Sequence, residues 1–418
     1  MTIASVLIGT MLEWYDFSLL GSMAPIMSTL FFPSKLVMLS LLASLSVFAS
    51  GFLVRPIGGI IFGYIGDRDG RRAALSMTII LMALPTTLIG LLPTFHAIGM
   101  TAPILLVFLR LIQGVASSGE YPGAVCFLTE IAPANRRGLW GSISVFGVVG
   151  GILLGSVISA VLSWCLSAEQ MYSWGWRIPF LISLPLGVVG WHVRYKVKET
   201  DIFQTAKLTE EAFKNPLGQV IKFNFANLCK VIILFSLSNI SFYISFVYIS
   251  TYLVSTHKVT FHQALLNNTI SMIVLVLCLP LFGYISDKIN RKYIMLIGAS
   301  FLLVFFYPIF TLFLAPNHFS FLMGQILAAV FIAIYAGPMA ATTAETFSTF
   351  TRYSGISMAL NIGAGVFGGT CPLVAAYLTQ CSGKGTMPCI YPMIFAFLCL
   401  LVICTLRSGN QTSLNDLI

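Results

Sequence analysis

Charged side chains occur inside the apolar runs of the first part of this chain, where hydrophobic residues would be expected. Glu13 and Asp16 lie three residues apart in the first run, so an α-helix places both carboxylates on one face. Arg55 follows in the second run, and Arg110 and Glu120 in the fourth. A charge at the centre of a membrane costs roughly 2.5–3.5 kcal/mol even on a lenient scale, so these groups are expected to face one another or water.

Together these five charges predict a buried cluster that takes up and releases a proton. Apolar surroundings favour the neutral form of a carboxylic acid, whereas a neighbouring arginine favours the ionised form. We therefore expect the acid with the weaker arginine contact to exchange a proton near neutral pH, and the sequence does not choose among the three acids. Two alternatives stay open. The charges could form a static salt-bridge set that fixes helix packing, and Glu13 and Asp16 could lie at the membrane interface.

The composition requires a membrane around these charges. The chain has 418 residues, of which 57% are hydrophobic and only 9% are charged, against about 25% charged in soluble domains. Its apolar runs are continuous and about twenty residues long, which selects transmembrane helices. We predict twelve spans, near residues 5–30, 38–64, 73–93, 101–128, 139–163, 176–193, 228–254, 264–285, 293–314, 320–344, 354–379 and 389–406.

A charged turn between two predicted spans occurs twice in the chain. Residues 63–72 read GYIGDRDGRR, and residues 283–292, which lie 220 positions later, read GYISDKINRK. Such a repeat indicates two similar halves. The predicted fold is therefore an all-α membrane protein of two pseudo-symmetric six-helix bundles, at residues 1–193 and 227–418, with a cytoplasmic linker at 194–226.

The repeated turn and a second repeat predict a gate at one end of the bundles. Glu130 and Arg137 recur as Glu345 and Arg352, each 215 positions later. We expect Asp67 to cap the N-terminus of a neighbouring helix, a contact that breaks when the halves move; the alternative is an ordinary anchoring loop. The predicted cytoplasmic gate comprises Gly63, Asp67, Arg68, Arg71, Arg72, Glu130, Arg137, Asp287, Arg291, Glu345 and Arg352.

The net charge of +9 is distributed as a topology signal. Loops on one side of the predicted spans hold most of the lysines and arginines, which places that side, both termini and the repeated turn in the cytoplasm. We expect a multi-pass protein of the plasma membrane, of the bacterial inner-membrane type. Because the basic residues are spread over separate short loops, a nucleic-acid partner is not expected.

The second half carries no charge deep in its spans and offers neutral polar groups instead. We expect these groups, with two residues of the first half, to line a substrate cavity, where aromatic faces could hold a quaternary ammonium group. For any single serine or tyrosine the alternative is hydrogen bonding between helices. The predicted cavity-lining residues are Tyr15, Gln113, Asn239, Tyr243, Gln325, Tyr335 and Asn361.

Other motifs point to no metal or organic cofactor. The G-x-G-x-x-G at residues 363–368 follows no strand, so we interpret its glycines as helix packing rather than a dinucleotide site. His257 and His262 have no third ligand nearby in the sequence. Nine cysteines include no C-x-x-C pair; Cys381 and Cys389 share a loop and could form a disulfide, but free thiols are favoured. The only coupling ion that we expect is the proton.

By these features the chain resembles transporters of the major facilitator superfamily. More narrowly, it is similar to the metabolite–proton symporters, which include carriers of proline and betaine, 2-oxoglutarate, citrate and shikimate. Pro122 and Ser286 depart from the pattern, since each stands where the family usually has glycine. The resemblance is carried by residues 13–17, 55–56, 63–72, 110–114, 119–121, 345, 352–355, 361–363 and 367–373.

The resemblance implies uptake of a small polar metabolite together with protons, by rocking of two six-helix halves. The sequence does not choose between a zwitterion and a carboxylate. An exporter or a uniporter is the alternative within transport, and a membrane receptor or sensor is the alternative outside it. An enzyme is not expected, since there is no nucleophile–base pair, metal set or phosphate loop. We expect the protein to be a monomer in the lipid bilayer.

Overall fold

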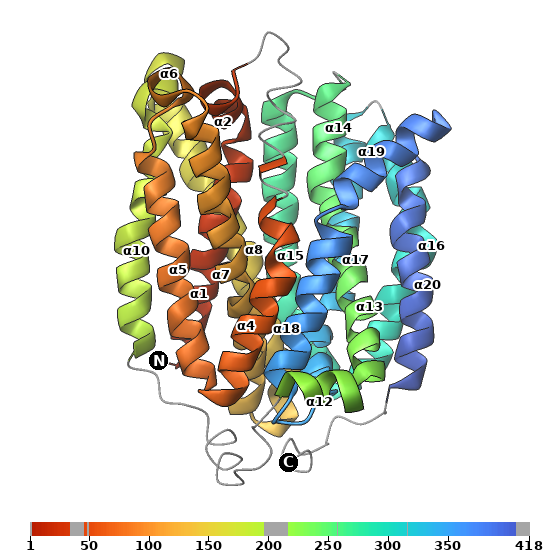
Figure 1. The fold of residues 1–418 in the computed structure, drawn as a ribbon. Helices are drawn as coiled ribbons and strands as arrows, with labels where there is room; N and C mark the ends of the chain where they lie inside the picture. The colour runs from red at the N-terminus through yellow and green to blue at the C-terminus, as the bar shows by residue number, and fades with distance from the viewer. Residues whose placement is uncertain are drawn as a thin grey trace. The chain divides into compact units, whose positions relative to one another are not determined.

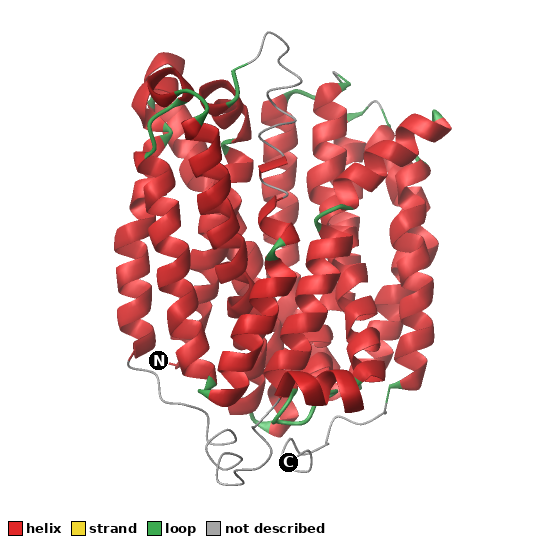
Figure 2. Cartoon of the chain, viewed as in Figure 1, coloured by secondary structure: helices red, strands yellow, loops and turns green. Residues whose placement is uncertain are grey.

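In the computed structural model the described residues are 2–33, 46–47, 50–195, 216–256, 258–315 and 317–406. All regular structure within these ranges is helical (Figure 2), which confirms the predicted all-α class. Nine helical segments in this part of the chain are long and apolar enough to cross a membrane: Arg71–Leu91, Thr101–Ile131, Ala134–Leu162, Phe225–Val254, Gln263–Lys288, Arg291–Leu314, Phe319–Ala344, Arg352–Ser382 and Met387–Thr405.

The described parts of the other three predicted spans also coincide with helices. The first covers α1 (Thr2–Ser22) and α2 (Ala24–Phe31), which are separated at Met23. The second ends in α4 (Arg55–Arg68), and the sixth is α10 (Arg177–Tyr195). Most of the predicted linker at 194–226 lies outside the described residues. Its described part is mostly helical: it holds the last two residues of α10, the separate helix α12 (Pro216–Phe223) and the first two residues of α13 (Phe225–Phe242).

Contacts divide the chain into two compact units. Unit 1 consists of residues Met1–Ala124 and Gly147–Pro216, and unit 2 of Val125–Phe146 and Leu217–Ile418. The end of α7 (Thr101–Ile131) and the start of α8 (Arg137–Cys165) therefore belong to unit 2, although the sequence repeat assigns them to the first half. The domain boundaries derived from the repeat remain a prediction.

In unit 1, α1 packs against α10 and against α5 (Arg71–Leu91), and α5 and α10 pack extensively on each other (Figure 1). The core at one end of this unit is apolar and includes Tyr15, Trp176 and Phe180. Helix α8 comes close to α1, since a Cβ atom at Gly151 would overlap the Met11 carbonyl oxygen. The glycines of α8 thus permit the close packing that holds α1 in place.

Unit 2 is built around α17, which packs on α15 and α16, while α20 packs on α16 and α13 packs on α18. Two of its spans contain a π-helical segment, Tyr243–Tyr248 after α13 and Gly363–Gly368 after α18. Such segments leave the regular hydrogen-bond ladder and are frequent at functional sites. The helices of this unit are α13 (Phe225–Phe242), α14 (Ile249–Ser255), α15 (Phe261–Lys288), α16 (Arg291–Leu314), α17 (His318–Ala344), α18 (Arg352–Ile362), α19 (Cys371–Ser382) and α20 (Ile390–Thr405).

The two copies of the charged turn start their second helix differently. Gly70 precedes α5 with φ of 115°, a conformation that favours glycine. Asn290, at the equivalent position before α16, has an extended φ of 175°, and its side chain accepts a hydrogen bond from the Lys292 backbone N–H at 2.9 Å. The first copy therefore needs glycine, and the second uses an asparagine N-cap.

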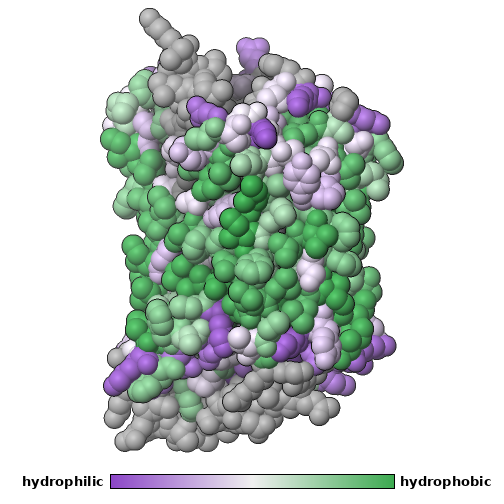
Figure 3. Space-filling view, turned by 90° about the vertical axis from the view of Figure 1, so that its right-hand side faces the viewer, coloured by the Kyte–Doolittle hydropathy of each residue, from purple (hydrophilic) through white to green (hydrophobic). Residues whose placement is uncertain are grey.

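The surface agrees with a lipid environment. On the face shown in Figure 3, apolar residues gather over the middle, and hydrophilic residues gather toward the upper and lower margins. Large apolar side chains such as Leu53, Leu277 and Leu373 are each more than 60% exposed. Lipid chains can cover such residues without a hydrophobic penalty, and the hydrophilic margins match the headgroup regions.

Candidate functional site

Asp16 of α1 lies in unit 1 among hydroxyl groups. Its side chain is buried, with 4% of the residue exposed. The Ser183 hydroxyl of α10 donates a hydrogen bond to Oδ2 at 2.9 Å, and the Thr86 hydroxyl of α5 neighbours the carboxyl group while it donates to the Met82 carbonyl oxygen. Within the described residues, Oδ1 has no hydrogen-bond partner and no basic side chain forms an ion pair with Asp16. The acid is therefore solvated by neutral groups.

A chain of hydrogen bonds runs from Arg110 of α7 to Thr86, the hydroxyl neighbour of this acid on α5. An Arg110 N–H donates to Gln113 Oε1 at 3.1 Å, and Gln113 Nε2 donates to Thr86 Oγ1 at 2.7 Å. Both Arg110 and Gln113 are buried. Because arginine can only donate, it fixes the orientation of the Gln113 amide, with its oxygen toward Arg110 and its NH₂ toward Thr86.

Two of the buried arginines of unit 1, Arg55 and Arg110, lie beside aromatic rings. The Arg110 guanidinium carbon is 3.9 Å from the Phe17 ring centroid, and its N–H groups donate to the Phe17 carbonyl oxygen at 3.4 Å. The Arg55 guanidinium carbon is 5.3 Å from the Trp14 ring and 5.6 Å from the rings of Phe17 and Phe52. Ring faces attract cations, so these contacts help to stabilise both charges within the helices.

Glu120 of α7 is the second acid that accepts hydrogen bonds from hydroxyls. It is fully buried and accepts from Thr10 of α1 at 3.3 Å and from Thr78 of α5 at 2.9 Å. Glu13 is 3% exposed, so all five charges that the sequence singled out are buried in this unit. The four hydroxyl residues were not predicted, because serine and threonine are ordinary in membrane helices.

The residues predicted to line a cavity are divided between the two units. In unit 1, Tyr15 lies in the apolar core and donates to the Pro179 carbonyl oxygen at 2.7 Å. In unit 2, Tyr335 is fully buried and donates to the Leu234 carbonyl oxygen at 3.0 Å. Asn361 donates to the Ser357 carbonyl oxygen of its own helix at 2.7 Å. These side chains are engaged within the protein.

Three of the predicted residues of unit 2 lie at the π-helical segments. Asn239 donates to the Phe235 carbonyl oxygen at 2.8 Å, and a Cβ atom at Gly368 would come within 2.9 Å of Asn239 and 3.3 Å of the Tyr243 ring. Gln325 donates to the Ser245 carbonyl oxygen at 2.9 Å. The π-segment at Tyr243–Tyr248 is thus held by a side chain of α17, which fixes its irregular backbone.

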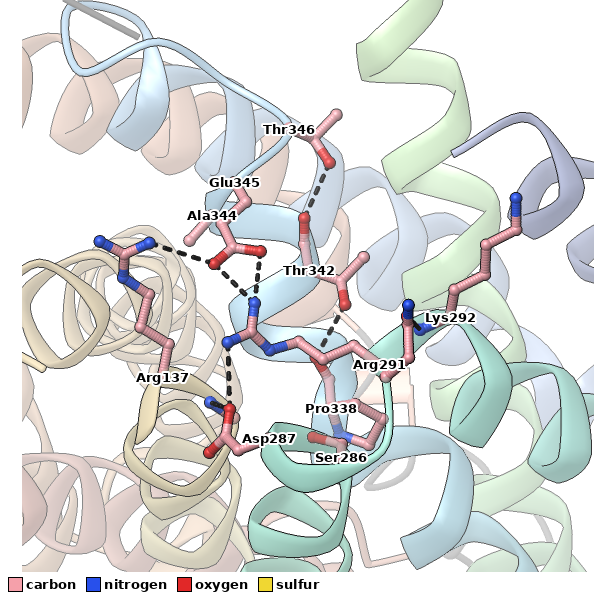
Figure 4. A network of polar contacts seen from close by, with 12 residues as sticks. Arg137, Ser286, Asp287, Arg291, Lys292, Pro338, Thr342, Ala344, Glu345 and Thr346 are labelled. Atoms are coloured by element: carbon pink, nitrogen blue, oxygen red, sulfur yellow. Dashed lines mark hydrogen bonds and ion pairs between the residues drawn. The ribbon is translucent and has the colours of Figure 1, made fainter. Parts of the chain in front are cut away.

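The predicted gate residues of unit 2 form a network of ion pairs (Figure 4). Glu345 accepts from an Arg291 N–H at 2.6 Å through each oxygen, and from Arg137 at 3.4 Å. Arg291 also forms an ion pair with Asp287 at 3.0 Å. A separate, fully buried pair joins Glu130 and Arg352 at 2.8 Å. Charge-assisted hydrogen bonds of this kind are strong. Removing one partner is costly, because it leaves the other charge buried without that partner.

Asp287 caps the start of α8. Its two carboxylate oxygens accept from the backbone N–H groups of Gly138 at 2.8 Å and Leu139 at 2.9 Å. Helices α8 and α15 meet closely at this point, because a Cβ atom at Gly138 would lie 2.6 Å from the Gly283 carbonyl oxygen. The repeated motif therefore supplies both the glycine for the close approach and the acid for the cap.

In the first copy of the turn, Asp67 forms a fully buried ion pair with Arg71 at 3.1 Å. Arg71 also donates to the Gly66 carbonyl oxygen at 2.8 Å. Arg68 is exposed and bonds to the Tyr64 hydroxyl at 2.7 Å. Gly63 is buried, and Arg72 is partly buried. The helix cap that we predicted for Asp67 stays a prediction, while its counterpart Asp287 makes such a cap.

We expect Asp287→Asn to destabilise the protein. An amide keeps one acceptor for the α8 N-terminus and loses the ion pair with Arg291, a change worth roughly 1–2 kcal/mol. The midpoint of thermal unfolding of the purified protein should fall by a few degrees. Asp69→Asn is the matched control, because Asp69 is 55% exposed and its pair with Arg68 is 3.9 Å long. An equal change in both variants would contradict the role of Asp287.

Comparisons with known proteins show the family to which the chain belongs. The family model described as "Sugar (and other) transporter" matches residues 1–222, and that of the Major Facilitator Superfamily matches residues 231–412. The proline/betaine transporter of Escherichia coli strain K12 is 34% identical over 97% of this chain and 83% of its own length. The chain belongs to the major facilitator superfamily.

Further members of the superfamily support the same fold and class. A glycine betaine/proline/ectoine/pipecolic acid transporter of Dickeya dadantii is 34% identical over 96% of this chain and 81% of its own length. The solved proton:xylose symporter XylE superposes with a TM-score of 0.82 at 17% identity, covering 99% of this chain and 97% of that one. The major facilitator fold is therefore confirmed, and the protein is a multi-pass membrane transporter of a small molecule rather than an enzyme.

Proposed function

We propose that this transporter is a proton-coupled symporter that takes up a small zwitterionic osmolyte such as proline or glycine betaine, and that Asp16 carries the proton. The observation that carries the proposal is the surroundings of Asp16. This carboxyl group is buried and contacts hydroxyls, and it forms no ion pair within the described residues.

These surroundings suit reversible protonation. A carboxylate that accepts from hydroxyls can be ionised in a buried site, because hydrogen bonds stabilise its charge. The same acid can be neutral, because protonation breaks no ion pair of Asp16. An acid such as Glu130, bound to Arg352 at 2.8 Å, is a poorer proton carrier, since protonation would leave a buried guanidinium without that partner.

The substrate class is inferred from the relatives and from the chemistry near Asp16. The similar proteins named above are described as transporters of proline, betaine, ectoine and pipecolic acid. Guanidinium groups such as that of Arg110 bind carboxylates well. Aromatic faces such as those of Trp14 and Phe52 attract quaternary ammonium groups. A zwitterion presents both kinds of group, so it suits this part of unit 1 better than a sugar does.

We further infer that the ion-pair network of unit 2 is the cytoplasmic gate. In a carrier that works by alternating access, contacts at one end must break while those at the other end form. The ion pairs join Glu130 and Arg137 of the first repeat to residues of the second repeat. These salt bridges can therefore break together during the transport cycle. In this proposal both termini lie on the same, cytoplasmic side and the protein acts as a monomer in the plasma membrane.

Uptake into proteoliposomes tests this function. Vesicles containing the purified protein are given an external medium more acidic than their interior, with radiolabelled proline or glycine betaine outside. A symporter concentrates the label, and a protonophore abolishes the accumulation. Accumulation only when the interior is the acidic side would instead indicate an exporter that exchanges protons. Equilibration that ignores the pH gradient would indicate a uniporter, and binding without flux would indicate a receptor.

A further inference from the structure

The Thr86 hydroxyl is a donor with two possible acceptors. It has a single proton, which in this structure goes to the Met82 carbonyl oxygen at 2.8 Å. Its oxygen already accepts from Gln113, whose orientation is fixed by Arg110. The donors and acceptors of the hydrogen bonds from Arg110 to Thr86 are therefore fixed. Only the acceptor of the Thr86 hydroxyl proton can change. The second acceptor within reach is the Asp16 carboxyl group.

Ser183 offers the same choice from the other side of the carboxyl group. Its hydroxyl donates to Asp16 Oδ2 at 2.9 Å, and the Ala83 carbonyl oxygen lies 3.5 Å from the same hydroxyl oxygen. Met82 and Ala83 are successive residues of α5, so both alternative acceptors belong to one turn of one helix. Each hydroxyl can thus satisfy its donor with or without Asp16.

We propose that Thr86 and Ser183 are positioning residues that form a hydroxyl switch around Asp16, turning toward its carboxylate when it is ionised and toward α5 backbone carbonyls when it is protonated. The proposal rests on the proposed role of Asp16 as the proton carrier. The incoming proton comes from water and binds Oδ1, the oxygen that has no hydrogen-bond partner in the described structure. No other covalent bond changes, because the hydroxyls only rotate.

Such a switch solves a problem of buried proton carriers. An ionised acid needs donors, but the same donors would be buried and unsatisfied once the acid is neutral, at a cost comparable to a lost hydrogen bond. Here the α5 carbonyls take up the released donors. The two protonation states can therefore interconvert without an unsatisfied hydroxyl and without movement of α1.

The titratable groups around Asp16 come from several elements. Helix α5 presents none between residues 73 and 91, and no basic group forms an ion pair with Asp16 in the part of the chain that the structure describes. The charged and titratable groups on the helices of unit 1 that contact α1 include Glu13 and Tyr15 on α1 itself, Arg55 on α4, Arg110 and Glu120 on α7, and Arg177 and His192 on α10.

The test is a pH titration of the purified, full-length protein by infrared difference spectroscopy. The carbonyl stretch of protonated Asp16 is assigned as the band that disappears in Asp16→Asn. Thr86→Val and Ser183→Ala each remove one donor to the ionised form, so the titration midpoint should rise by about one pH unit, a roughly tenfold increase in proton affinity. Thr86→Ser keeps the hydroxyl and should restore the midpoint of the wild type.

The chain offers a matched control. Ser76 lies on the same helix α5, and its hydroxyl donates to the Arg72 carbonyl oxygen at 2.8 Å, which takes no part in the switch. Ser76→Ala removes a hydroxyl from the same helix and should leave the midpoint where it is. Because the readout needs no substrate, it does not depend on the choice of osmolyte. If Thr86→Val does not fold, Ser183→Ala and Thr86→Ser still decide the question.

The outcomes separate this inference from the function on which it rests. If Asp16→Asn removes no titrating band, Asp16 is not the proton carrier and the proposed function loses its main support. If the band is present but its midpoint is the same in Thr86→Val, Ser183→Ala and the wild type, the hydroxyl switch is wrong while the carrier role stands. A midpoint that rises in both variants and returns in Thr86→Ser supports the switch.

Discussion

Asp16→Asn is expected to abolish proton-driven accumulation of substrate while leaving exchange of substrate across the membrane. The amide has nearly the shape of the acid and can still accept from Ser183 at the position where Oδ2 now lies. It cannot bind or release a proton in the physiological range, so the substrate gradient is no longer tied to the pH gradient. Proteoliposome uptake under an acidic external medium should fall at least a hundredfold at steady state.

Counterflow distinguishes loss of coupling from loss of the site. Vesicles preloaded with unlabelled proline or glycine betaine should still take up the labelled compound through Asp16→Asn at a rate within about tenfold of the wild type. Glu169→Gln is a suitable control, because Glu169 is exposed and lies on α9 (Ala168–Gln170), away from these contacts. Concentrative uptake by Asp16→Asn at the level of the wild type would exclude Asp16 as the proton carrier.

Glu345→Gln is expected to reduce turnover at least tenfold with little change in the substrate concentration for half-maximal uptake. Glu345 is the carboxylate shared by Arg291 and Arg137. Without its charge both largely buried guanidiniums lose this ion-pair partner, and truncation of one partner of a buried pair typically costs about 3–5 kcal/mol. The state in which this network is closed should become rare, so the transport cycle slows at that step.

A second substitution tests whether the charge or the shape of Glu345 matters. Arg137→Gln, added to Glu345→Gln, removes the excess positive charge that Glu345→Gln leaves in the network. It should restore part of the turnover, which a double-mutant cycle would measure as coupling. Arg136→Gln is the control, because Arg136 is exposed and neighbours Arg137 in the chain. Initial rates of uptake at saturating proline or glycine betaine give the turnover. Equal rates in Glu345→Gln and the wild type would contradict a gating role.

The charged parts of this molecule were accessible from the sequence, because a carboxylate or a guanidinium inside an apolar run is conspicuous. Glu13, Asp16 and Arg110 were found in this way, and the repeats drew attention to the acids and arginines of the network. The fold class followed from run length and low charge. These inferences need only residue type and spacing, which the chain displays directly.

The neutral parts of the site were not accessible in the same way. Thr86 and Ser183 are hydroxyl residues that could equally have bonded to their own helices, and nothing in their spacing relates them to Asp16 across the bundle. The sequence also predicted a cap for Asp67, and the cap in unit 2 is made by its counterpart Asp287. The π-helical segments had no compositional signal, and the contact of Tyr243–Tyr248 with Gln325 of another helix could not be read from spacing along the chain.

The pairing of Glu130 with Arg352 and of Glu345 with Arg137 has an evolutionary consequence. In an ancestral homodimer of single repeats, one glutamate and one arginine per copy would have made both bonds by symmetry. After duplication and fusion, the glutamate of each repeat was paired with the arginine of the other repeat. A substitution at one of these positions would therefore leave a charge in the other repeat without its partner. A chimera that joins one repeat of this carrier to the other repeat of a distantly related transporter should transport substrate only if both glutamates and both arginines are retained.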